Sequence, residues 1–77
     1  MDIQALERAA RWFNQNQWFV DDLEAKGDRL VRFLVGRLNH CVARYNNMSE
    51  ESEDIKGYYL QEANDAVADL YERFPTP

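Results

Sequence analysis

The chain has 77 residues, which is the size of one small domain, and its one cysteine excludes an internal disulfide. No cluster of cysteine and histidine predicts a zinc ion, and we predict no cofactor. Because one core of this size supplies only about 3–5 kcal/mol of stability, we expect self-association, most simply as a homodimer.

The formal net charge of −5 is unevenly distributed along the chain. Residues 1–48 carry seven Lys or Arg and six Asp or Glu, whereas residues 49–77 carry two and eight. An acidic C-terminal part disfavours direct binding to nucleic acid and favours a protein partner with a basic surface.

The N-terminus lacks a basic segment followed by an apolar run, so we expect no signal peptide. No apolar stretch approaches the ~18 residues of a membrane span, so we expect no membrane helix. Together with a free cysteine, these features predict a cytoplasmic protein.

The first predicted helix follows Asp2, whose side chain suits an N-cap. Its apolar residues recur at helical spacing, at Ile3, Leu6, Ala10 and Phe13. A helical wheel that continues past this stripe leaves Val20 off it, so we expect a turn over residues 14–17. Asn16 is then the expected N-cap of the next helix.

The stretch from Val20 to Tyr45 has the broad apolar face of a helix that packs against a core. At about 100° per residue, the apolar side chains fall within an arc of roughly 140°. They are Val20, Leu23, Leu30, Val31, Leu34, Val35, Leu38, Cys41, Val42 and Tyr45. Because residues on both sides of Gly27 share this phase, we expect one unbroken helix. The alternative is a break at Gly27–Asp28, with the glycine ending one helix and the aspartate capping the next.

The long helix is expected to end near Asn46–Asn47, where two asparagines favour a turn. Ser49 is the expected N-cap of a third helix that runs to about Phe74 and is stopped by Pro75 and Pro77. The apolar face of this helix consists of Ile55, Tyr59, Ala63, Ala66, Val67, Leu70 and Phe74.

These three helices predict an all-α fold, because no segment shows the alternation of a strand. We expect residues 1–77 to form one helical domain. A short N-terminal helix accompanies a long antiparallel helical hairpin, in the manner of a three-helix bundle.

Two charged stripes flank the apolar faces of the second and third predicted helices. The basic stripe contains Lys26, Arg29, Arg37, His40 and Arg44. The acidic stripe contains Glu51, Asp54, Glu62, Asp65, Asp69 and Glu72. The stripes can form weak ion pairs within the hairpin, each contributing ~0–1 kcal/mol. Alternatively, the acidic stripe contacts a basic partner or another subunit, and it is our first candidate partner-binding surface.

The dipeptides Trp12-Phe13 and Trp18-Phe19 flank four polar residues. Phe13 lies on the first apolar stripe, whereas both tryptophans lie off the helical stripes. Tryptophan is frequent at interfaces because it buries a large area and keeps one polar group. Either the two indoles pack together and close the end of the bundle, or an exposed tryptophan binds a partner. Trp12 and Trp18 are the second candidate surface, which we call the aromatic corner.

His40 and Cys41 are sequence neighbours, but adjacent side chains on a helix diverge by about 100°, so we expect no catalytic pair. Cys41 lies inside the apolar arc and is expected to behave as a small buried hydrophobic residue.

The pattern Glu50-x-x-Glu53 followed by Glu62-x-x-Asp65 resembles the ExxE…ExxD arrangement of MazG-like nucleotide pyrophosphohydrolases. The resemblance implies carboxylates from separate helices that hold Mg²⁺ against a triphosphate. Here both pairs lie on one predicted helix, which cannot surround an ion. Instead of facing carboxylates, the long helix offers Arg32, Gly36 and Arg37. We therefore predict neither a metal site nor an enzyme.

The predicted function is that of a non-catalytic, acidic, helical protein-binding module, an adaptor or inhibitor that acts by occupying a partner protein. Compact acidic proteins of this size are common products of bacteria and their phages. The alternatives are a MazG-like Mg-dependent nucleotide pyrophosphohydrolase and a purely structural self-assembling subunit.

Overall fold

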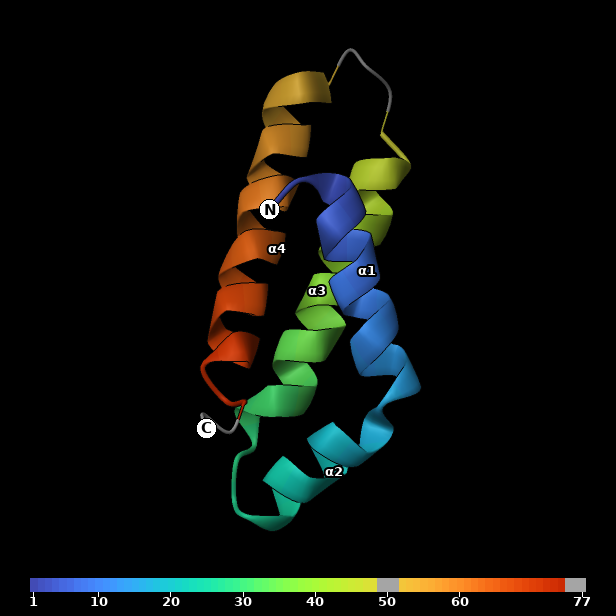
Figure 1. Ribbon diagram of the computed structural model, residues 1–77. Helices are drawn as coiled ribbons and strands as arrows, with labels where there is room; N and C mark the ends of the chain where they lie inside the picture. The colour runs from blue at the N-terminus through green and yellow to red at the C-terminus, as the bar shows by residue number, and fades with distance from the viewer. Residues whose placement is uncertain (49–51, 75–77) are drawn as a thin grey trace.

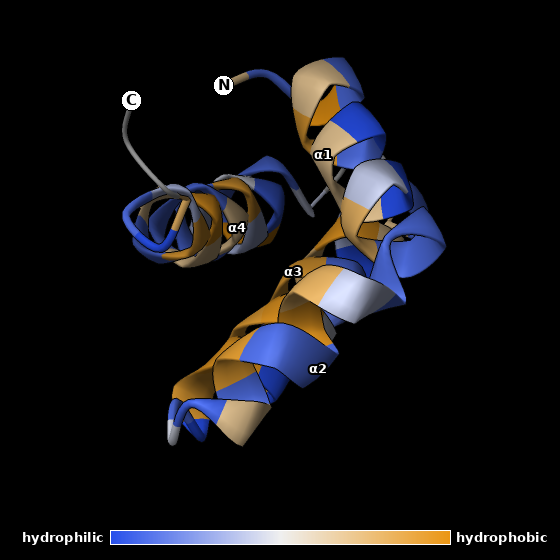
Figure 2. Ribbon diagram, turned by 60° about the horizontal axis from the view of Figure 1, so that its bottom comes forward, coloured by the Kyte–Doolittle hydropathy of each residue, from blue (hydrophilic) through white to orange (hydrophobic). Residues whose placement is uncertain are grey.

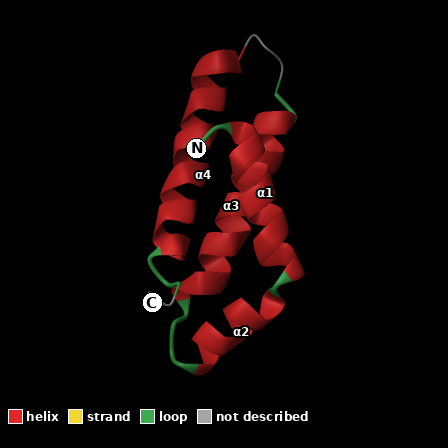
Figure 3. Cartoon of the chain, viewed as in Figure 1, coloured by secondary structure: helices red, strands yellow, loops and turns green. Residues whose placement is uncertain are grey.

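The computed structural model describes residues 1–48 and 52–74, and every regular element in these ranges is a helix (Figures 1 and 3). The helices are α1 (Ile3–Gln15), α2 (Gln17–Ala25), α3 (Leu30–Asn46) and α4 (Glu53–Tyr71). The all-α prediction is confirmed. α3 and α4 run antiparallel and make the most extensive contact between helices, so the predicted hairpin is present (Figure 1).

α3 lies at the centre of the molecule and contacts each of the other helices. Figure 2 shows α4 on one side of α3 and α1 on the other, with hydrophobic residues gathered along α3. All four helices contribute to one core, which consists of Leu6, Ala9, Ala10, Phe13, Phe19, Val20, Val31, Leu34, Val35, Leu38, Cys41, Val42, Ala63, Ala66, Val67 and Leu70. Every buried residue in the described ranges is apolar.

The start of α1 and the turn after it agree with the sequence prediction. The Asp2 carboxylate accepts a hydrogen bond of 2.8 Å from the backbone N–H of Ala5. Asn16 occupies the predicted N-cap position of α2, but its side chain makes no capping bond. Instead, its amide donates to the Trp12 carbonyl (2.7 Å) and its side-chain oxygen accepts from the Trp18 indole N–H (3.1 Å). One asparagine thus holds the chain on both sides of the turn.

The expectation of one unbroken helix before the asparagine pair is wrong, because Gly27 ends α2 with a φ of 99° that favours glycine. The Gly27 N–H donates to the Glu24 carbonyl (3.0 Å), and the Asp28 N–H donates to the Leu23 carbonyl (2.9 Å). This pair of bonds is the Schellman arrangement of a helix C-terminus. The Asp28 carboxylate then accepts from the backbone N–H of Leu30 (3.0 Å) at the start of α3. The structure therefore has the alternative arrangement, in which Gly27 ends one helix and Asp28 bonds to the start of the next.

The ends of the hairpin helices are close to those predicted. α3 ends at Asn46, as expected, whereas α4 begins at Glu53 and ends at Tyr71, about one turn before the expected end at Phe74. Three residues with predicted roles at helix ends lie outside the described residues, namely Ser49, Pro75 and Pro77.

Two residues of the predicted apolar faces are largely exposed, Leu30 at 59% and Ile55 at 50%. Each lies in the first turn of its helix, at an end of the hairpin, where fewer neighbouring elements can cover it. Conversely, Ala9 and Phe19 are buried although neither belongs to a predicted apolar face. None of the helices in residues 1–48 and 52–74 combines the length and hydrophobicity that a bilayer crossing requires.

Candidate protein-binding surfaces

The aromatic corner between α1 and α2 is a cluster of packed rings. Trp12 meets Phe13 and Phe19 edge to face, with centroids 5.1 and 5.8 Å away. The indoles of Trp12 and Trp18 also meet, 6.3 Å apart at 72°. Phe74, just past the end of α4, lies 4.8 Å from Phe19. The contact between the indoles expected for a packed corner is therefore present, and the cluster extends to the last turn of the hairpin.

The two tryptophans nevertheless differ in exposure, with Trp12 at 36% and Trp18 at 61%. A hollow of about 370 Å³ lies beside them and is lined by Trp12, Trp18, Phe19, Asp22, Leu23, Lys26, Arg73 and Phe74. Most of this lining is aromatic or aliphatic, and the remainder is charged. A large exposed aromatic side chain beside an apolar hollow is typical of protein interfaces.

A second hollow, of about 400 Å³, lies between α1 and the end of α4. It is lined by Met1, Ala5, Arg8, Ala9, Trp12, Phe13, Tyr71 and Phe74. Because Trp12 and Phe74 line both hollows, the apolar surface continues from one to the other. The small side chains of Ala5 and Ala9 leave this space open.

Polar side chains join α1 to α3 on the flank away from α4. The Asn46 amide donates to the Glu7 carboxylate (2.8 Å). The side chains of Asn14 and Asn39 exchange two hydrogen bonds, both of 2.9 Å. These direct contacts satisfy the polar groups at the edge of the core.

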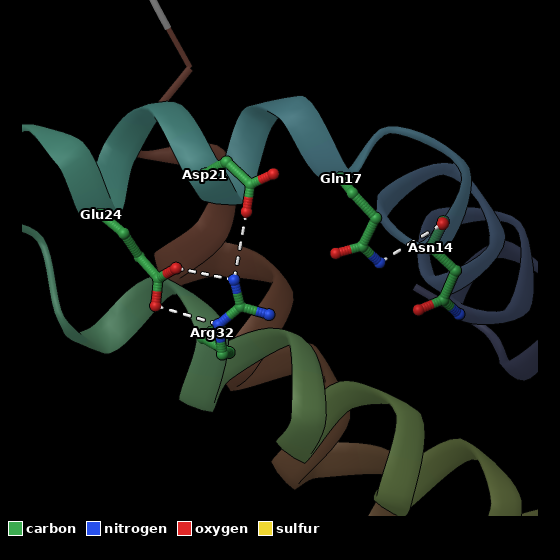
Figure 4. A network of polar contacts seen from close by, with 5 residues as sticks. All are labelled: Asn14, Gln17, Asp21, Glu24 and Arg32. Atoms are coloured by element: carbon green, nitrogen blue, oxygen red, sulfur yellow. Dashed lines mark hydrogen bonds and ion pairs between the residues drawn. The ribbon is translucent and has the colours of Figure 1, made fainter.

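Arg32 makes the corresponding connection between α3 and α2 (Figure 4). Its guanidinium donates to both oxygens of the Glu24 carboxylate (2.6 and 3.0 Å) and to Asp21 (3.2 Å). The hydrogen bond to Arg32 lowers the pKa of Glu24 below its ordinary value of 4.5. At the corner, the Gln17 amide donates to the Asn14 carbonyl (3.4 Å).

These contacts form one polar ladder with a regular register. Its rungs pair Glu7 with Asn46, Asn14 with Asn39, and Asp21 with Arg32. Each step of about seven residues along α1 and α2 is matched by an equal step back along α3, as antiparallel helices require. Residues seven apart drift only ~20° round a helix, so Glu7 and Asn14 share one flank of α1, and Arg32, Asn39 and Asn46 share one flank of α3. This ladder was not predicted from the sequence, although polar residues recur at a spacing of seven in both segments.

The break at Gly27 divides the basic stripe that was predicted for one long helix. Lys26 belongs instead to the end of α2, where it pairs with Asp22 (2.9 Å). Arg29 precedes the first residue of α3. The members that share α3 are Arg37, His40 and Arg44.

The acidic stripe follows α4, apart from Glu51, which lies outside the described residues. Glu62 forms the expected ion pair across the hairpin, with Arg37. The remaining members are exposed, and none of them forms an ion pair within residues 1–48 and 52–74; they are Asp54, Asp65, Asp69 and Glu72. The stripe therefore carries negative charge that the described part of the chain does not neutralise.

The hairpin has a face that the polar ladder does not reach. At about 100° per residue, Phe33 and His40 lie roughly 100–120° round the α3 axis from Asn39. On α4, Asp65 lies about 100° from Asn64, whose side chain accepts a hydrogen bond from the amino group of residue 1. We call this surface the open face; its residues are Phe33, Gly36, Arg37, His40 and Arg44 on α3 and Tyr58, Glu62, Asp65 and Asp69 on α4.

Cys41 is buried, as expected, and burial raises the pKa of its thiol. His40 is exposed on the open face, where its ring lies 6.2 Å from that of Tyr59 at 75°. The thiol and the imidazole thus belong to different environments, as the helical geometry predicts.

The acids of the pyrophosphohydrolase pattern do not come from facing helices. Glu53, Glu62 and Asp65 all belong to α4, and Glu50 lies outside the described residues. Glu62 is engaged by Arg37. In residues 1–48 and 52–74, no three His, Cys, Asp or Glu side chains are grouped closely enough to hold a metal ion.

A further ion pair, which was not predicted from the sequence, joins the loop between α2 and α3 to the end of α4. The Arg73 Nε donates to the Asp28 carboxylate (2.6 Å), and the side chains are 20% and 25% exposed. The hydrogen bond from Arg73 lowers the pKa of Asp28 below its ordinary value of 3.8, and the bond from the Leu30 N–H acts in the same direction. Partial burial opposes this shift.

Comparison with known proteins identifies no relative of this chain. No protein-family model matches the chain, and neither curated proteins nor solved structures show significant similarity to it.

Proposed function

We propose that this chain is a non-catalytic protein-binding module that acts by occupying a partner protein, as an adaptor or inhibitor. The observation that carries the proposal is the exposure of Trp18, at 61%, beside an apolar hollow that Trp12 and Phe74 also line. Aromatic side chains in such positions supply much of the energy of protein interfaces, because they bury a large area with few rotatable bonds.

The partner presents an apolar side chain to the hollows and basic groups to the acidic stripe. Glu72, a member of that stripe, lies in the sequence between Tyr71 and Phe74, which line the hollow between α1 and α4. Acidic and apolar side chains are therefore both present at the end of α4. We further propose that the module is a homodimer in a reducing cytoplasm, where Cys41 remains a thiol.

The test begins with capture of a partner from the source cells on the immobilised 77-residue chain. The Kd of the purified partner is then measured for the wild type and for Trp18→Ala. We expect the variant to bind at least ~10-fold more weakly, as for a hot-spot tryptophan.

Tyr58→Ala is the matched control, because Tyr58 is 60% exposed and lies on α4 away from the corner. We expect its Kd to stay within about twofold of the wild-type value. Equal affinities for wild type and Trp18→Ala would remove the corner as the binding site. Mg²⁺-dependent release of pyrophosphate from nucleoside triphosphates would overturn the non-catalytic assignment.

A further inference from the structure

The joint at Gly27 interrupts an apolar face that the sequence continues across it. Val20 and Leu23 of α2 have the helical phase of the apolar side chains of α3, so a single helix over residues 17–46 would place them all on one side. In the structure Gly27 has a φ of 99°, and no other residue in the ranges 1–48 and 52–74 has a positive φ. Arg29, two positions later, is already in the right-handed helical region. The bend therefore depends on the conformation of one glycine.

The polar ladder has a register that is centred on this joint. Its rungs are Glu7 with Asn46, Asn14 with Asn39, and Asp21 with Arg32. In every rung the midpoint of the two sequence positions lies between Lys26 and Gly27. Two copies in which α2 and α3 form one helix, related by a two-fold axis at this midpoint, would place the same side chains opposite one another. The ladder can thus form between two chains as it does within one.

We propose that the homodimer forms by exchange of α1 and α2 between two copies of this chain. In each copy α2 and α3 join into one helix across Gly27, and α1 and α2 pack on α3 and α4 of the other copy. This inference rests on the proposed function for the homodimer and names the surface that each copy offers, which is the ladder flank of α3. Every rung then joins the two copies, twice by symmetry.

The buried side chains of α1 and α2 select a second copy as the partner. A single chain with a continuous helix would withdraw Phe13, Phe19 and Val20 from a core in which they are at most 3% exposed. Exposing them costs free energy in proportion to their apolar area. Another extended copy presents the same α3 and α4 surface, left free by its own α1 and α2. The matching surface is therefore provided by the same sequence rather than by an unrelated protein.

The ion pairs near the joint are compatible with both forms. In the folded-back chain the Asp28 carboxylate accepts from Arg73 (2.6 Å). A continuous helix gives up this bond but places Asp28 four residues before Arg32, a spacing that favours an ion pair along a helix. The pair of Asp22 with Lys26 already has this spacing and is retained. Exchange therefore replaces one charge contact with another.

The first test changes the joint itself. Alanine disfavours a φ of 99° and favours a helix, so Gly27→Ala should weaken the folded-back form and strengthen the continuous helix. Light scattering after gel filtration at increasing protein concentration gives the dimer Kd, which should be at least ~100-fold lower than that of the wild type. An unchanged Kd, or a variant that stays monomeric at every concentration, would overturn the proposal.

Gly36→Ala is the matched control for helix propensity. Gly36 belongs to α3 in both forms, and an added Cβ meets no atom within 4 Å, so alanine should favour both forms equally. We expect its dimer Kd to stay within about twofold of the wild-type value. Equal decreases for Gly27→Ala and Gly36→Ala would show that the joint has no special role, which contradicts exchange.

A second test asks whether the contact between α2 and α3 lies within one chain or between two. Arg32 bonds to Glu24 across this contact (Figure 4), so Arg32→Glu and Glu24→Arg each bring like charges together. Both are made in chains that also carry Gly27→Ala, and they are then mixed. In an exchanged dimer of the two different variants, both contacts join opposite charges. Such dimers should outnumber the homodimers by at least ~10-fold in native mass spectrometry.

Charges that meet within one chain cannot be re-paired by mixing, so a random mixture of the three dimers would contradict exchange. The side chains of Arg32 and Glu24 are 57% and 35% exposed, and circular dichroism checks that both variants keep their helix content. If either variant loses it, the comparison of Gly27→Ala with Gly36→Ala decides alone.

Failure of this inference is distinguishable from failure of the proposed function, because partner binding is measured separately at Trp18. If Gly27→Ala leaves the dimer Kd unchanged while Trp18→Ala still weakens partner binding, only the exchange is lost. If the exchange passes both tests while Trp18→Ala binds the captured partner as the wild type does, only the assigned binding site is lost.

Discussion

The two flanks of α3 differ in where their polar side chains find partners. On the ladder flank, Arg32, Asn39 and Asn46 each bond to a side chain of α1 or α2. On the open face, within residues 1–48 and 52–74, one ion pair joins α3 to α4, between Arg37 and Glu62, and the aromatic and charged side chains around it stay exposed.

This difference separates architecture from interaction. Direct polar pairs that satisfy each other at the edge of a core specify the register of the helices of one chain. Exposed charges gain little from one another across water, because each pair contributes only ~0–1 kcal/mol. Substitutions on the ladder flank should therefore lower the stability of the fold, whereas substitutions on the open face should change it little.

The largest effect is expected where α3 faces the core. Leu38 is 0% exposed, so Leu38→Ala should lower the free energy of unfolding by about 2–5 kcal/mol, through lost burial and an unfilled cavity. Phe33→Ala, on the open face of the same helix, should change it by less than ~0.5 kcal/mol when the chain is monomeric. Urea denaturation of dilute protein measures both. Equal losses would show that Phe33 packs within one chain.

The next largest effect is expected at the joint between α2 and α3. Gly27 has a φ of 99°, and nothing lies within 4 Å of an added Cβ, so the cost of Gly27→Ala is one of backbone conformation alone. It should reduce the free energy of unfolding by about 1–2 kcal/mol. Thermal unfolding followed by circular dichroism is the measurement. An unchanged midpoint would indicate that α2 and α3 can merge into one helix without penalty.

The central rung of the ladder should contribute a measurable but smaller amount. Asn39→Ala removes both hydrogen bonds to Asn14, and we expect a loss of about 1 kcal/mol. In a double-mutant cycle, Asn14→Ala with Asn39→Ala should cost less than the sum of the two single changes. Strict additivity would mean that the two amides do not stabilise each other in solution.

On the open face, one substitution should act in the opposite direction. Gly36→Ala should stabilise the monomer by about 0.5–1 kcal/mol, because alanine favours a helix and its Cβ meets no neighbour. Chemical denaturation of dilute protein measures the change, and a lower midpoint for Gly36→Ala than for the wild type would contradict the prediction.

Much of this fold follows from hydrophobic periodicity, because that periodicity reports burial directly. It predicted the turn after α1 and most of the core, whereas the turn preference of Asn46 and Asn47 predicted the end of α3. The prediction of a continuous long helix failed because α2 is short and Val20 happens to share the phase of α3. Phe19 argued against one continuous helix, because it is apolar but lies about 100° from Val20 on the wheel. In the structure Phe19 is 3% exposed.

The polar contacts were less predictable, because their partners come from distant segments. From its sequence neighbours, Asn46 is predicted to be a turn residue. Its hydrogen bond to Glu7 in the folded chain shows that it belongs to the ladder. The link between Asp28 and Arg73 joins residues 45 positions apart with no periodic signal. The aromatic corner could be located from sequence, whereas the exposure of Trp18 depends on how Asn16 turns the chain.

The smallest effect is expected at Asp28, in the loop between α2 and α3, and it depends on pH. The hydrogen bond from Arg73 lowers the pKa of Asp28 below 3.8, so the folded state favours the carboxylate. Its stabilising contribution is therefore present above pH 3.8 and is lost as the pH falls through the lower folded-state pKa. Asp28→Asn should have a lower unfolding midpoint than wild type near neutral pH, and the two midpoints should converge in acid. Asp65→Asn is the matched control, because within residues 1–48 and 52–74 the Asp65 carboxylate bonds only to Gln61, one turn away on the same helix. A difference for Asp28→Asn that persists unchanged in acid would show that the loop is held by packing rather than by this ion pair.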